Sequence, residues 1–209
     1  MSNMTVRGFP PGGTKKQLAR VSDDGFGIEF DDPAQATWED IIIDGFALRR
    51  GSTPPGVVPF GPSGGLYAIG FDGAGTTEIV YGSFEIPHSY KEGTDLHPHI
   101  HWAPTTSVAG NVKWQMEYSI VNVNGTFGAP TTIAATDATD ATAWKHLFAS
   151  FPDISGSGLA IGAIVMFRLF RNPTDAADTY GSDACLISLG IHYQQDTAGS
   201  YEIATKGYP

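Results

Sequence analysis

The stretch NVKWQMEYSIVNV, residues 111–123, alternates apolar and polar side chains from Val112 to Ile120. Successive side chains of an extended strand point to opposite faces, so this alternation predicts a strand with one buried face. The other face should meet water or a neighbouring subunit, because it carries Lys113, Gln115, Glu117 and Ser119. The pair Asn124-Gly125 that follows is typical of a turn between antiparallel strands.

Similar short segments occur on both sides of this stretch, separated by residues that favour turns. Their β-type composition and spacing favour an all-β protein with an antiparallel two-sheet β-sandwich, and we expect it to be jelly-roll-like. Two further strands should precede a Gly/Pro-rich loop at residues 49–65. The eight segments are 66–71, 77–86, 97–103, 111–123, 131–135, 143–151, 159–171 and 184–195.

The N-terminal residues differ from the rest of the chain in charge and composition. We expect residues 1–24 to form an extended basic arm and residues 25–209 to form a single β-sandwich domain. The first 20 residues contain four basic residues and no acidic one, against a net charge of −10 for the whole chain. The basic residues of the arm are Arg7, Lys15, Lys16 and Arg20.

The composition argues against two classes of partner, nucleic acids and membranes. A chain with a pI near 4.8 lacks the excess of Lys and Arg that binds phosphates, so we predict no nucleic-acid partner. We also predict no membrane partner, since Arg168 interrupts the longest apolar stretch, which is too short to span a bilayer. Arg168 and Arg171 are expected to pair with acidic residues.

The sequence offers no convincing catalytic motif. The single cysteine, Cys185, excludes an intramolecular disulfide and alternates with apolar residues, so a buried and inert thiol is expected. Neither a nucleophile elbow nor a phosphate-binding glycine loop nor a zinc-protease motif is present. We therefore predict a protein without enzymatic activity and without a cofactor.

Three histidines alternate in HPHIH, residues 97–101, and should project from one face of a strand. Ile100 and Trp102 take the other face, which should pack into the core. The favoured interpretation is a polar seam between subunits, because imidazoles can pair there without burying a permanent charge. The candidates for this seam are His97, His99, His101, Glu117 and His192.

A metal site is the alternative for these histidines, and we do not favour it. GTDLHPHIH matches the opening of the cupin metal motif at Gly93, His99 and His101, but Thr105 and Thr106 stand where that motif expects a glutamate. A cupin-like metalloprotein would need a ligand set from different strands. The set that the sequence could supply is His99, His101, His192 and Glu117.

Two stretches carry motifs that can be compared with known families. Residues 81–120 contain PHxYKEGTDLxPHxHW around Pro87, Gly93, His99, His101 and Trp102, and residues 192–200 read HYQQDTAGS. In these motifs the chain resembles a family of structural proteins encoded by tailed bacteriophages and prophages. The resemblance implies a virion-associated β-sandwich and no catalytic residues.

Decoration or cement proteins of phage heads commonly combine a β-rich body with an extended arm. The resemblance therefore leads us to expect a capsid decoration protein, with a homotrimer favoured, located in virions assembled in the host cytoplasm. Its partners would be the major capsid protein or other virion proteins, with the arm residues Arg7, Lys15, Lys16 and Arg20 contacting the shell. The alternative is a tail fibre or baseplate component that contacts the host.

Overall fold

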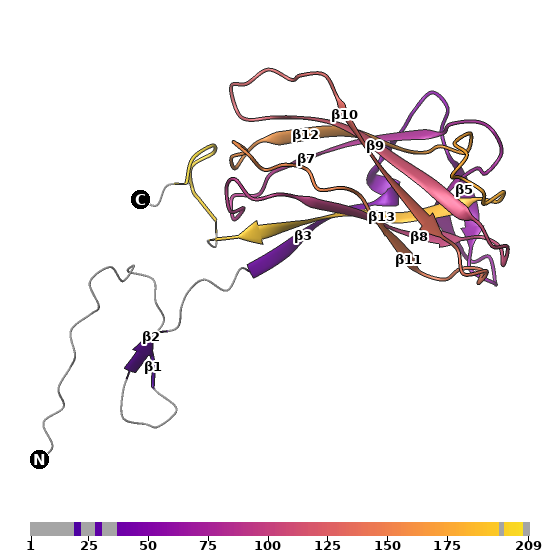
Figure 1. Ribbon diagram of the computed structural model, residues 1–209, viewed down its shortest axis with the longest axis horizontal. Coiled ribbons are helices and arrows are strands. Elements are labelled where there is room, and N and C mark those ends of the chain that lie inside the picture. The colour runs from indigo at the N-terminus through magenta and orange to yellow at the C-terminus, as the bar shows by residue number, and fades with distance from the viewer. Residues whose placement is uncertain (1–18, 22–27, 31–36, 197–198, 207–209) are drawn as a thin grey trace, which may run out of the picture. The chain divides into compact units, whose positions relative to one another are not determined.

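The computed structural model describes residues 19–21, 28–30, 37–196 and 199–206 (Figure 1). The chain divides into two units, Met1–Ala36 and Thr37–Pro209. In the first unit, β1 (Ala19–Val21) pairs antiparallel with β2 (Ile28–Phe30), and Arg20 lies opposite Glu29. The predicted arm residues Arg7, Lys15 and Lys16 lie outside the described residues, so the proposed boundary of the arm at residue 24 stays a prediction.

The second unit is a sandwich of two antiparallel sheets (Figure 1). The strand order is β11-β8-β13-β6-β5 in one sheet, with β3 also paired to β13, and β10-β9-β12-β7-β4 in the other. We call the first the histidine sheet and the other the second sheet. The strands are β3 (Thr37–Asp44), β4 (Arg49–Arg50), β5 (Gly56–Phe60), β6 (Leu66–Phe71), β7 (Ile79–Glu85), β8 (His97–Pro104), β9 (Asn111–Val121), β10 (Thr131–Ala138), β11 (Leu147–Ser150), β12 (Ile164–Arg171) and β13 (Ala184–Gln195).

The strands from β6 to β13 follow jelly-roll topology. The chain changes sheet at every step except between β9 and β10, and the four-stranded orders β6-β13-β8-β11 and β7-β12-β9-β10 result. These are the two interleaved sheets of a double Greek key. The predicted all-β sandwich of jelly-roll type is thus confirmed.

Aromatic side chains fill the space between the sheets. Trp114 of β9 packs edge-on against Phe71 of β6 and Trp102 of β8, with ring centroids 5.3 and 6.1 Å apart. All three side chains are fully buried. The alternation in residues 112–116 is confirmed, because Val112, Trp114 and Met116 are buried while the polar residues between them are partly exposed.

The predicted loop at residues 49–65 is wrong in part, since it contains two short strands. β4 pairs with β7, and β5 pairs with β6 over its full length. Pro59 lies within β5, where a missing backbone N–H is tolerated because β5 is the edge of its sheet. The many Gly and Pro residues of this segment hid a hairpin that turns at Gly61 and Gly64, both with positive φ.

The two arginines of β12 pair with carboxylates, as predicted. Arg168 binds Glu117 of β9 through two hydrogen bonds of 2.8 and 2.7 Å. Arg171 binds Asp178 in the same way, at 2.9 and 2.7 Å, and also donates to the carbonyl groups of Phe71, Tyr180 and Ser182. Arg171 therefore joins the end of β12 to the β12–β13 loop.

The remaining local predictions concern Cys185 and the helices. Cys185 is buried, as predicted, and this burial, with the charge of Asp183, raises the pKa of its thiol to about 12. The one helix in the described residues is a single 3₁₀ turn, Gly45–Ala47. Accordingly, the described part of the chain has no helix with the length and apolarity that a membrane crossing requires.

Candidate metal centre on the histidine sheet

The outer face of the histidine sheet is built by three neighbouring strands, β3, β13 and β8. Their antiparallel register places side chains in rows across the sheet, and one row contains Asp40, His192 and His97. The next row contains Ile42, Gly190 and His99. The three histidines of β8 share this face, as predicted, while Ile100 and Trp102 are buried on the opposite side of the strand.

Five of the six histidines gather on this face. The ring of His99 lies 5.1 Å from that of His101 and 4.6 Å from that of His192. His146, which precedes β11, brings its Nε2 to 2.7 Å from Nδ1 of His101. We call this set, which comprises His97, His99, His101, His146 and His192 together with Asp40, the histidine face.

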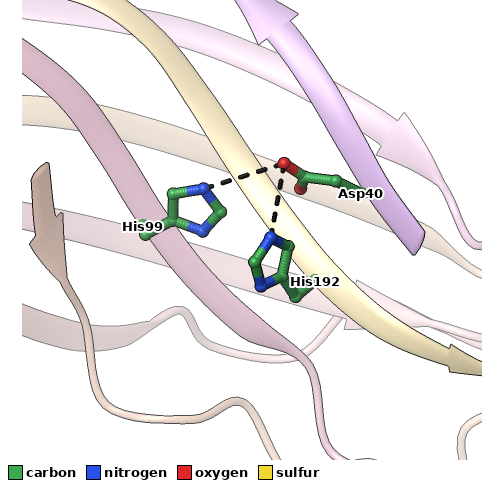
Figure 2. A group of neighbouring side chains, drawn as sticks. All are labelled: Asp40, His99 and His192. Carbon is green, nitrogen blue, oxygen red and sulfur yellow. Dashed lines mark ion pairs between the residues drawn. The ribbon is translucent and has the colours of Figure 1, made fainter. Parts of the chain in front are cut away.

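The carboxylate of Asp40 faces the imidazoles of His99 and His192 (Figure 2). Its Oδ2 is 3.7 Å from Nε2 of His99 and 3.6 Å from Nε2 of His192. Its Oδ1 is buried and has no hydrogen-bond partner among the described residues. Asp40, His99 and His192 can thus each direct one ligand atom to a common point, and these atoms lie within 4.8 Å of one another.

Gly190 provides the space in which the His99 ring lies. A Cβ at this position would overlap the His99 ring and would stand 3.1 Å from Oδ1 of Asp40. Any side chain on the central strand at this point would therefore displace the imidazole from the carboxylate. The position of the His99 ring thus depends on the lack of a side chain at residue 190 of β13, the central strand of the site.

The outer members of the histidine face have different partners. His97 contacts Asp153 through Nδ1 at 2.7 Å and packs against the Trp38 ring. Desolvation lowers the pKa of His101, and the neighbouring His99 and His146 lower it further by charge repulsion. The His101 imidazole is therefore neutral at neutral pH and can share a hydrogen bond with His146.

The ligand set drawn from the sequence is not assembled, because Glu117 belongs to the second sheet. Its carboxylate is paired with Arg168 and lines a separate cavity of about 860 Å³ beside Tyr81 and Met166. Asp40 supplies the carboxylate of the histidine face instead. Asp40 lies in one of the two strands expected before residue 49, but no local pattern indicated that this strand would pair with the one containing His192.

Apolar side chains border the histidine face on both sides. Ile42 of β3 is 70% exposed and Phe148 of β11 is 64% exposed. A cavity of about 400 Å³ opens on this face beside Phe148. Its lining includes Asp40, His97, His99, His101, His192 and Phe148. The cavity therefore contains nitrogen and oxygen donor atoms. The exposed apolar side chains beside it form a surface on which another protein could pack.

The first motif, residues 87–102, contacts residues 194–196 of the second motif in the fold. The backbone N–H of Lys91 donates to the carbonyl of Gln194 at 2.7 Å, and the side chain of Gln195 donates to Ser89. Tyr90 is buried and its hydroxyl donates to the carbonyl of Thr94. Most motif residues thus build one corner of the sandwich, while His99, His101 and His192 remain on the histidine face.

Comparison with known proteins does not identify a family for this chain. No protein-family description matches the sequence, and no curated protein sequence is similar to it. Among solved structures, CBM35 from Cellvibrio japonicus Abf62 is 12% identical with a TM-score of 0.42, over 81% of this chain and 99% of that one. A chain of infectious bursal disease virus, Gx strain, is 13% identical with a TM-score of 0.40, over 91% of this chain and 40% of that one. Likenesses at this level leave the function open.

Proposed function

We propose that this chain is a bacteriophage virion structural protein, and more narrowly a head decoration or cement protein that acts as a homotrimer without enzymatic activity. The observation that carries the proposal is the exposed apolar border of the histidine face. Trp38, Ile42 and Phe148 lie on the outer surface of one sheet, on both sides of the histidines. Large apolar side chains grouped on a surface are typical of a protein–protein contact.

The motifs in residues 81–120 and 192–200 support the same proposal. They resemble phage structural proteins, and Ser89 and Lys91 of the first contact Gln195 and Gln194 of the second. Their role would be structural, since their buried members Tyr90 and Leu96 contribute to the core. The role proposed for the chain is therefore to present a rigid sandwich to neighbouring subunits.

The basic N-terminal residues are proposed to attach the protein to the shell. Residues 1–20 carry Arg7, Lys15, Lys16 and Arg20, whereas the remaining residues have a large acidic excess. A basic segment gains steering and charge-assisted hydrogen bonds against an acidic surface. The proposed partner is the major capsid protein.

Labelling of purified phage particles tests the location. An antibody against the chain should decorate heads in electron micrographs, and the protein should be detected by mass spectrometry of particles after density purification. Label confined to tails would replace this proposal by a fibre or baseplate role. Absence of the chain from purified particles would refute a virion role altogether.

Two variants test the contacts. Deletion of residues 1–20 should abolish head occupancy while the circular dichroism spectrum of the sandwich is unchanged. Phe148→Asp should convert the oligomer to monomers in light scattering, because it places a charge in the proposed seam. Met166→Asp is the matched control, since Met166 is half exposed on the second sheet. Equal oligomer size for Phe148→Asp and the control would contradict the seam.

A further inference from the structure

Three side chains from three different strands converge on the histidine face without a hydrogen bond between them. Nε2 of His99 and Nε2 of His192 stand 3.7 and 3.6 Å from Oδ2 of Asp40, which is longer than a hydrogen bond. Around a tetrahedral zinc ion with bonds of roughly 2.0–2.1 Å, neighbouring ligand atoms are about 3.3–3.4 Å apart. These two separations are therefore close to those of ligands that share an ion, and all three ligand atoms lie within 4.8 Å of one another.

The surroundings of the three groups are also those of a metal site. Oδ1 of Asp40 is buried without a hydrogen-bond partner among the described residues, although such atoms are normally satisfied. The His99 side chain is only 10% exposed, and its Nδ1 faces the carbonyl oxygen of His97 at 3.5 Å. A proton on Nδ1 directed at a carbonyl leaves Nε2 free to bind a cation.

We propose that Asp40, His99 and His192 bind a zinc ion on the outer face of the histidine sheet. Two imidazole nitrogens and one carboxylate oxygen form a donor set that suits zinc and neighbouring late first-row divalent ions. The fourth position opens on the cavity of about 400 Å³, where water or a group of a neighbouring subunit completes the coordination. The ion would link β3, β13 and β8 and would neutralise the partly exposed carboxylate of Asp40.

Titration calorimetry of the full chain, purified without a histidine tag and stripped with chelator, tests the site with zinc chloride. One zinc should bind per chain, and zinc should raise the thermal midpoint. His192→Ala and Asp40→Asn should weaken binding by about 100-fold or more, since each removes a direct ligand. The His192 side chain is 55% exposed, so its removal should leave the circular dichroism spectrum unchanged.

Two further variants separate this site from other histidine clusters. Gly190→Ala should weaken zinc binding although it removes no ligand, because its Cβ displaces the His99 ring. His88→Ala is the matched control, since His88 contacts Glu85 and Ser200, away from the histidine face. Cobalt in place of zinc should give the visible absorption of a tetrahedral site in the wild type and in the control.

The proposal is overturned if the stripped protein binds no zinc at millimolar concentration. It is equally overturned if His192→Ala and Asp40→Asn bind zinc as tightly as the wild type. Binding lost in His146→Ala but kept in His192→Ala would place the ion at the His101–His146 pair instead. None of these readouts depends on the location of the chain in a virion.

Discussion

Replacing Arg171 with methionine should destabilise the sandwich by about 3–5 kcal/mol, because it leaves a carboxylate buried without its cation. The side chains of Arg171 and Asp178 are only 1% and 2% exposed. After the substitution, the backbone N–H of Lys113 would still donate to Asp178 at 2.8 Å. The carbonyl groups of Phe71, Tyr180 and Ser182 would lose a donor as well.

Arg168→Met provides an internal comparison on the same strand. Arg168 makes an equally short bidentate pair with Glu117, but these side chains are 38% and 20% exposed. A pair that water can reach contributes at most about 1 kcal/mol. Burial, together with the three carbonyl groups that lose their donor, should therefore make the effect at Arg171 several times larger than the effect at Arg168, although the two carboxylate pairs have the same geometry.

Urea denaturation and thermal melting of both variants measure the difference. For a chain of this size, about 3–5 kcal/mol lowers Tm by about 6–20 °C. The double variant Arg171→Met with Asp178→Asn should recover part of the loss, because no charge is then left unpaired. Equal destabilisation by Arg171→Met and Arg168→Met would refute the role assigned to burial, as would a double variant no more stable than Arg171→Met.

Three other positions give predictions that depend on different interactions. Cys185, with a thiol pKa of about 12, should resist thiol reagents at pH 8 in the folded protein and react fully in urea; labelling of the folded protein would contradict its burial. Burial and the nearby charges of Asp72 and Asp183 raise the pKa of Glu78, so its charged form destabilises the fold above the unfolded pKa. Glu78→Gln should raise stability at pH 7, and the gain should vanish in melts below about pH 4, where the carboxyl is protonated in both states. Gly156→Ala should cost about 1–3 kcal/mol in urea denaturation, because its Cβ would overlap the Thr94 carbonyl group, whereas Gly181→Ala, with open space around it, should stay within about 0.5 kcal/mol.

Local patterns in the sequence were sufficient for the strands and for their buried faces. The alternation around Trp114 and the placement of His99 opposite Ile100 depend only on the two-residue period of an extended chain, and both are confirmed. Cys185 was predictable for the same reason. Pro59 misled the prediction, since its presence argues against a strand unless the strand is known to lie at an edge.

The composition of the histidine face could not be predicted, because it depends on pairing between distant segments. Asp40 and His192 are neighbours only because β3 pairs with β13, and they are 152 positions apart in the chain. Glu117 was grouped with the histidines on polarity alone, yet its strand belongs to the other sheet. Side-chain alternation indicates a face of a strand but contains no information on which strand will lie beside it.

The position of β13 inside the histidine sheet determines when that sheet can form during synthesis. β13 lies between β8 and β6 in the sheet. Neither of these two strands can pair with β13 until residues 184–195 have been synthesised. A ribosome adding about 5–20 residues per second reaches Ala184 about 4–16 seconds after Pro104. During that interval both strands expose unpaired backbone edges. The sandwich can therefore close only after its last strand leaves the ribosome.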